Sequence, residues 1–214
     1  MPQFTTFLVQ NGIPLEALIW LLITPIAVTL IVIARHLIGI KGLGITTPLL
    51  IGFAFATTGL TRGLIIFFAI LAIGFLIRSL LARVRLLYLP KIAIILSGIT
   101  LAVLFLLPLV APLGGKSLPF PQAAFSIIIL IFSIDQFISF LNERGFKSTL
   151  GIVVEVTALA LLTFSLLTSQ WLIRAVVTYP LFVIISILFI NLALGRWTGL
   201  RLSEYLRFKN LIFK

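Results

Sequence analysis

The chain has 214 residues, of which 61% are hydrophobic and 10% are charged, and its mean hydropathy is +1.30. A soluble domain of this composition would have too little polar surface to cover itself, so the composition excludes a soluble globular protein and indicates a lipid bilayer as the surrounding solvent. The net charge of +11 does not indicate nucleic-acid binding, because the Lys and Arg residues are spread between apolar runs rather than gathered on one solvated face.

Seven apolar runs follow one another along the chain, each bounded by charged residues, Pro or Gly. Each run has close to the roughly 20 residues that an α-helix needs to cross a bilayer, and none shows the alternation of a barrel strand. We therefore predict an all-α integral membrane fold with seven transmembrane helices in a single domain, residues 1–214. The predicted spans are residues 15–34, 43–60, 64–82, 92–110, 123–141, 150–168 and 172–194.

The basic residues are divided unevenly between the two sides of the membrane. Cytoplasmic loops keep Lys and Arg, whereas translocated loops lose them. The loops and span ends after spans one, three, five and seven hold 13 of the 16 Lys and Arg residues, and the other side holds only Arg62, Lys116 and Arg174. This division predicts an outside N-terminus and a cytosolic C-terminus. Basic and apolar residues alternate over residues 201–214, which predicts an amphipathic helix on the cytosolic surface.

Spans one to three and spans five to seven share short patterns, which indicates a parallel internal repeat with a 3+1+3 plan. Each group ends in Arg-x4-Arg followed by Tyr, and each has a Gly-x-Lys segment after its first span. The alternative is chance similarity between apolar segments. The matching residues are Arg78, Arg83 and Tyr88 with Arg196, Arg201 and Tyr205, and Gly39 and Lys41 with Gly145 and Lys147.

The second span combines small residues with a proline. Gly44, Pro48 and Gly52 follow one another at four-residue spacing, and Ala56 continues the series. Such a stripe lets another helix approach closely, which is one interpretation. The other is a broken or re-entrant segment, because a proline removes a backbone hydrogen bond and nearby threonines can bind the freed groups or a substrate. The candidate segment consists of Gly44, Thr46, Thr47, Pro48 and Gly52.

Three charged residues fall inside predicted spans. A charge at mid-bilayer costs roughly 2.5–3.5 kcal/mol on insertion scales, so each one suggests a function. Arg78, Asp135 and Glu155 all lie about 6–9 Å from the cytosolic ends of their spans, at 1.5 Å per residue. We predict that they form a polar layer inside the bundle, with Arg78 as the nearest cation for the carboxylates. The layer is either a structural ion pair or a polar site open to the cytosol.

The sequence offers no catalytic or metal-binding constellation. It has no Cys, and its single His, His36, follows Arg35 at the end of the first span, where an imidazole is ordinary. Asp135 and Glu155 have no phosphate-binding Gly loop, activated nucleophile or metal-ligand spacing beside them. We therefore predict a protein that is not an enzyme and uses no cofactor or metal.

Two segments carry a resemblance to a known family. Residues 35–48 (RHLIGIKGLGITTP) and 195–208 (GRWTGLRLSEYLRF) resemble the bacterial seven-helix membrane domain that is usually fused to an inactive transglutaminase-like domain. More distantly, the Gly-Ile-x-x-Pro segment at residues 44–48 is similar to the small membrane subunit of poly-γ-glutamate synthase. The resemblance implies an ATP-grasp or Mur-like amide ligase as partner, and a role in assembly or export of an amino-acid-based product. This chain lacks the soluble domain of the fused form, and the family supplies no catalytic residues to transfer.

From these observations we expect a non-enzymatic, multi-pass accessory subunit of the bacterial cytoplasmic membrane. It would dock a cytosolic amide ligase or help to export the ligase product. The alternatives are a solute or ion transporter, with its path along span two and the Asp135 and Glu155 layer, and a structural subunit of a larger membrane complex. A homo-oligomer is compatible with the sequence, which names neither the substrate nor the partner.

Overall fold

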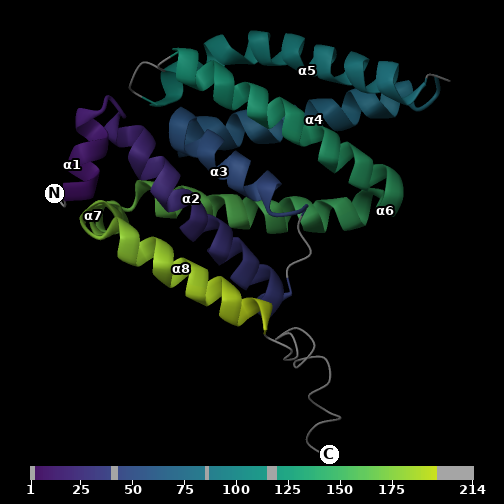
Figure 1. The fold of residues 1–214 in the computed structure, drawn as a ribbon. Helices are drawn as coiled ribbons and strands as arrows, with labels where there is room; N and C mark the ends of the chain where they lie inside the picture. Colours follow the sequence, from purple (N-terminus) through teal and green to yellow (C-terminus); the bar gives the residue numbers. More distant parts are fainter. Residues whose placement is uncertain (1–2, 40–42, 85–86, 115–119, 197–214) are drawn as a thin grey trace, which may run out of the picture. The chain divides into compact units, whose positions relative to one another are not determined.

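The computed structural model describes residues 3–39, 43–84, 87–114 and 120–196, and all regular secondary structure in these residues is helical (Figure 1). The chain divides into two compact units. We call Met1–Ile45 with Ser165–Lys214 the terminal unit, and Thr46–Phe164 the central unit. The prediction of one transmembrane domain over residues 1–214 stays a prediction.

The terminal unit is built around α2 (Leu15–Ile33), which follows Pro14 directly. A π-helical turn, η1 (Ala34–Ile38), extends it to Gly39, whose left-handed φ of 86° ends the helical stretch. Helix α2 packs against α7 and α8. The other helices of the terminal unit are α1 (Gln3–Gln10), α7 (Gln170–Thr178) and α8 (Pro180–Gly195).

The seventh predicted span is not one straight helix. Helices α7 and α8 meet at Tyr179, which has φ −130° and ψ 58°, and the two axes are bent by 103°. The cause is Pro180, because proline donates no backbone hydrogen bond and disfavours helical geometry in the residue before it. Helix α8 is therefore only 16 residues long and Gly195 is its last residue.

The central unit contains a helix that doubles back on itself. Helical residues follow one another throughout α6 (Phe120–Thr168), but Gly145 has φ 77° and ψ 174°, which are not the angles of an α-helix. We call residues 120–144 the first arm of α6 and residues 146–168 the second arm, whose last four residues belong to the terminal unit. A straight helix of 49 residues would be about 74 Å long, far more than the roughly 30 Å hydrocarbon core. The other helices of this unit are α3 (Thr46–Thr58), α4 (Leu60–Leu81), α5 (Tyr88–Val110) and the 3₁₀ turn η2 (Ala111–Gly114).

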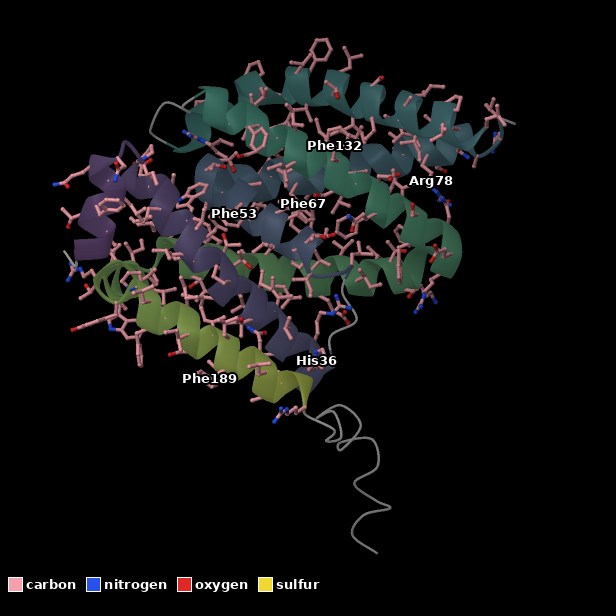
Figure 2. The ribbon with its side chains drawn as sticks, viewed as in Figure 1. His36, Phe53, Phe67, Arg78, Phe132 and Phe189 are labelled. Carbon is pink, nitrogen blue, oxygen red and sulfur yellow. The ribbon has the colours of Figure 1, made fainter. Side chains whose placement is uncertain are left out.

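The core of the central unit contains a cluster of three phenylalanines together with many buried isoleucines. Phe67 of α4, labelled in Figure 2, lies with its ring centroid 6.0 Å from that of Phe55 of α3 and 6.0 Å from that of Phe137 of α6. Both pairs have edge-on geometry. All three side chains are fully buried. Edge-on aromatic pairs stabilise by about 0.5–1.5 kcal/mol beyond their buried area, so this cluster fixes α3, α4 and the first arm of α6 together.

Length and composition allow four described helices to cross a membrane, or five if α7 and α8 form one span. The candidates are α2, α4, α5 and the region Ala123–Thr168, and α3 is a shorter apolar helix. Each predicted span overlaps helical residues, so the all-helical prediction is confirmed. The number seven, the orientation and the internal repeat stay predictions, and the expected surface helix at 201–214 lies outside the described residues.

Candidate functional site

The segment around Pro48 is a helix start rather than a break within a helix. Gly44 has a φ of 64° and lies in the turn before α3, so the four-residue stripe does not begin on the helix. Pro48 is in the first turn of α3, where a missing N–H has no intrahelical partner to lose. The sequence placed both residues in one span from 43 to 60, whereas α3 covers only Thr46–Thr58.

Gly52 packs α3 against the second arm of α6. A Cβ atom at Gly52 would lie 2.5 Å from Cβ and 2.6 Å from Cγ2 of Thr163, and 3.0 Å from the Ala160 carbonyl oxygen. These distances are too short for any side chain, so the glycine permits a close helix approach. At this position the structure supports the packing interpretation of the stripe.

Two side-chain hydrogen bonds connect α3 to the first arm of α6. Thr47 Oγ1 donates to Gln136 Oε1, and the hydroxyl groups of Thr57 and Ser126 bond to each other. The two hydrogen bonds are ten residues apart on each helix, and the residue numbers rise along α3 while they fall along α6. The two helices are therefore antiparallel neighbours. Thr46 and Thr47, both members of the predicted segment, are the first two residues of α3. Thr47 is buried.

Three helices of the central unit enclose a charged cavity of 300 Å³. It lies where α4 ends and α5 begins, beside the first arm of α6, and Figure 2 labels Arg78 at this end of α4. The lining residues come from α4, α5 and α6. They are Arg78, Lys91, Ile92, Ile95, Asp135, Ile138, Ser139 and Asn142.

The charged groups of this cavity do not neutralise one another directly. Arg78 donates from Nε and Nη2 to Asn142 Oδ1, over 2.8 and 2.5 Å. Asp135 Oδ1 is buried without a hydrogen-bond partner among the described residues. Within that part of the chain, neither Arg78 nor Lys91 forms an ion pair with Asp135. The structure therefore brings Arg78 and Asp135 into one cavity, but Asn142 accepts the hydrogen bonds that we expected a carboxylate to accept.

The third member of the predicted layer lies elsewhere. Glu155 is half-buried on the second arm of α6, makes its own interactions, and is not in the cavity lining. Sequence reasoning missed Lys91 and Asn142. Only the charge of Lys91 was used, in the count of cytosolic cations. Asn142 follows Asp135 by seven residues, a spacing that places both side chains on one helix face. That spacing was the available signal for Asn142.

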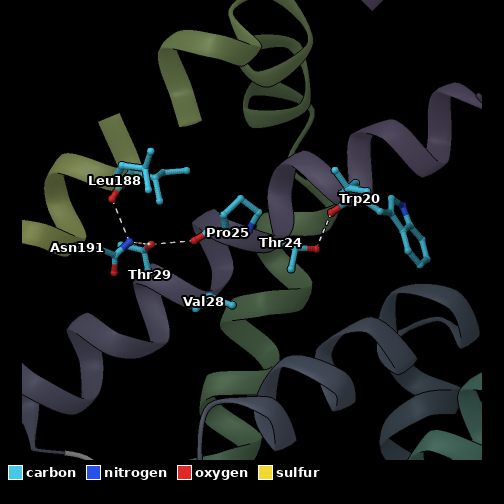
Figure 3. A pocket seen from close by; sticks show the side chains of 9 residues that line it. Trp20, Thr24, Pro25, Val28, Thr29, Leu188 and Asn191 are labelled. Carbon is cyan, nitrogen blue, oxygen red and sulfur yellow. Dashed lines mark hydrogen bonds between the residues drawn. The ribbon is translucent and has the colours of Figure 1, made fainter. Parts of the chain in front are cut away.

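A second hollow, an open apolar groove of 690 Å³, lies between α2 and α8 in the terminal unit (Figure 3). Pro25 interrupts the backbone hydrogen bonding of α2 along it. Asn191 Nδ2 donates to Thr29 Oγ1 over 2.7 Å and to the Ile187 carbonyl over 2.9 Å, while Thr29 Oγ1 donates to the Pro25 carbonyl. This short chain of hydrogen bonds is the polar floor of a groove whose walls are mainly apolar.

The comparisons with known proteins give one match. A family model described as seven transmembrane helices usually fused to an inactive transglutaminase matches residues 8–212. The chain belongs to this family. Neither the curated proteins nor the solved structures contain a match to the chain. The resemblance found at residues 35–48 and 195–208 is therefore confirmed, and this member of the seven-helix family is a multi-pass helical membrane protein.

Proposed function

We propose that this chain is a non-enzymatic subunit of the bacterial cytoplasmic membrane that docks a cytosolic amide ligase or helps to export its amino-acid-based product. The charged cavity carries the proposal. Arg78, Lys91 and Asp135 line it on three different helices, so it presents both signs of charge. Amino-acid units also carry both signs, which makes the cavity a suitable receiving site for the end of such a product.

The proposal includes seven spans, with the N-terminus outside and the cavity facing the cytosol. The two arms of α6 supply two spans because Gly145 separates them, and α7 with α8 supplies one bent span. Helix α3 supplies the seventh: its 13 residues reach only about 20 Å, so residues before Thr46 complete the crossing. In this arrangement 13 of the 16 Lys and Arg residues are cytosolic, as the positive-inside rule favours.

A transporter is the second candidate, and a row of polar groups along the first arm of α6 favours it. From Ser126, which bonds Thr57, the row passes buried Ser133 and reaches Gln136, which bonds Thr47. Ser126 and Gln136 are about 15 Å apart along the helix axis, about half of the roughly 30 Å hydrocarbon core. Ion- or proton-dependent solute flux that is lost in Gln136→Leu and kept in Glu143→Gln would favour the transporter over the docking subunit.

Copurification tests the docking proposal. The tagged full chain is purified from its native membrane in mild detergent, and bound proteins are identified by mass spectrometry and assayed for ATP-dependent amide-bond formation. We expect an ATP-grasp or Mur-like ligase in a fixed ratio to the chain. Recovery of the chain with no ligase, under conditions that keep it folded and monodisperse, would contradict docking and leave the transporter.

A further inference from the structure

The charged cavity of the central unit holds more hydrogen-bonding capacity than the protein uses. A guanidinium has five N–H donors, and Arg78 uses two atoms, Nε and Nη2, on the single acceptor Asn142 Oδ1. The ammonium of Lys91 forms no hydrogen bond or ion pair with any residue that the structure describes. The cavity therefore offers several cationic donors that remain available to an anion.

The same cavity holds an acceptor that lacks a donor. Asp135 Oδ1 is buried and has no hydrogen-bond partner in the described part of the chain. A buried carboxylate oxygen without a donor is destabilising, because its lost hydration is not replaced by a hydrogen bond. Arg78 and Lys91 line the same cavity but leave this oxygen unpaired, so the three charges stand apart around an open space of 300 Å³.

The signs of these charges restrict the ligand. A simple anion would be bound by Arg78 and Lys91 but would leave Asp135 unpaired and would be repelled by it. A simple cation would pair with Asp135 but would be repelled by the two cations. A molecule that carries an anionic group and a primary ammonium satisfies both sets of groups, and its carbon atoms can lie against Ile92, Ile95 and Ile138.

We propose that this cavity binds a small zwitterion, with its carboxylate or phosphate on Arg78 and Lys91 and its primary ammonium on Asp135. The cavity volume lies at the lower end of the range for ligand pockets, which fits one amino-acid unit or one lipid headgroup. Two sources share this chemistry: an amino acid, free or at a chain end, and the headgroup of an ethanolamine phospholipid. The assignment rests on the proposed function only in taking the cavity to be reachable from the cytosolic side.

Matched pairs of probes test the assignment on the purified full chain. L-alanine is compared with propionate, which lacks the ammonium, in detergent free of phospholipid. Phosphatidylethanolamine is compared with phosphatidylglycerol in nanodiscs. The readouts are the dissociation constant for the soluble pair and the thermal unfolding temperature for the lipid pair. We expect the ammonium-bearing member of at least one pair to bind at least about tenfold more tightly or to give the higher unfolding temperature.

The variants assign the two ends of the ligand. Asp135→Asn should remove the preference for the ammonium-bearing probe, and Lys91→Gln should weaken binding of both members of a pair. Glu143→Gln, at an exposed neighbouring carboxylate, should change neither the preference nor the affinity.

The pair that shows a preference identifies the source of the ligand. A preference for L-alanine identifies a soluble zwitterion, and a preference for phosphatidylethanolamine alone identifies the headgroup. Equal binding within both pairs by the natural chain overturns the proposal, even if Asp135→Asn fails to fold. A ligase that copurifies while both pairs bind equally would leave the docking function standing, and zwitterion binding without a ligase would leave this site standing.

Discussion

The central and terminal units use polar groups in different ways. In the central unit, Arg78, Lys91 and Asp135 gather around a cavity, and α3 is held by Gly52 against one arm of α6 and by hydrogen bonds against the other. In the terminal unit the groove between α2 and α8 has no charged lining residue, and Asn191 and Thr29 connect the two helices. The central unit therefore gathers charged groups around an open space, whereas the polar groups that line the groove of the terminal unit are uncharged.

The largest effect should come from filling the close approach of α3 to α6. Gly52→Leu would place a side chain within 2.5 Å of Thr163, so α3 must move, which costs about 1–3 kcal/mol or more. Thermal unfolding in detergent should show a loss of several degrees and a smaller monodisperse fraction. Gly151→Leu is the matched control because nothing lies within 4 Å of a Cβ there. Equal losses in the two variants would remove the packing argument.

The next effect concerns the cavity wall. Arg78→Ala removes both hydrogen bonds to Asn142 and leaves Asp135 with one cation fewer, so we expect a loss of about 1–3 kcal/mol in unfolding free energy. Arg83 is exposed after the end of α4, and Arg83→Ala should change stability by less than about 0.5 kcal/mol. The unfolding free energies of both variants, measured in the same detergent, test this difference. A loss for Arg83→Ala as large as that for Arg78→Ala would show that the cavity contacts do not stabilise the unit.

The smallest effect is expected in the terminal unit. Asn191→Leu removes the side-chain hydrogen bond to Thr29 but keeps an apolar residue in the groove, so the loss should be about 0.6 kcal/mol and no more than about 1.7 kcal/mol. Ser186→Ala, which removes a hydrogen bond only within α8, is the control. A loss for Asn191→Leu greater than that for Gly52→Leu would reverse the contrast between the two units.

Local sequence signals predicted the helical fold better than they predicted the site. Runs of about 20 apolar residues dictate helices in lipid, and Gly145 and Pro180 mark the places where α6 turns and α7 meets α8. The bend at Pro180 was readable from its ring chemistry but was not predicted. The start of α3 at Thr46 was misplaced, because apolar residues on both sides of Gly44 hide the turn.

The cavity depends on packing between helices that are distant in the sequence, so only part of it could be predicted. The distance of each residue from the cytosolic end of its predicted span placed Arg78 and Asp135 at the same depth in the membrane, and the structure does bring them into one cavity. Depth carries no information on the direction around a helix axis, which is why Glu155 was grouped with them although it lies outside the cavity. Lys91 enters the cavity from a helix start that looked like a membrane boundary.

The central claim is that the charged cavity of a seven-span protein is reached from the cytosol, and cysteine accessibility tests it most directly. The chain contains no Cys, so a single cysteine can be introduced into the natural sequence without background. Ser139→Cys lines the cavity, and Ser117→Cys lies between spans four and five, on the predicted outer side. With a membrane-impermeant maleimide, Ser139→Cys should react only in inside-out vesicles and Ser117→Cys only in right-side-out vesicles. Reaction of Ser139→Cys from the outside, or of both cysteines from the same side, would contradict the account.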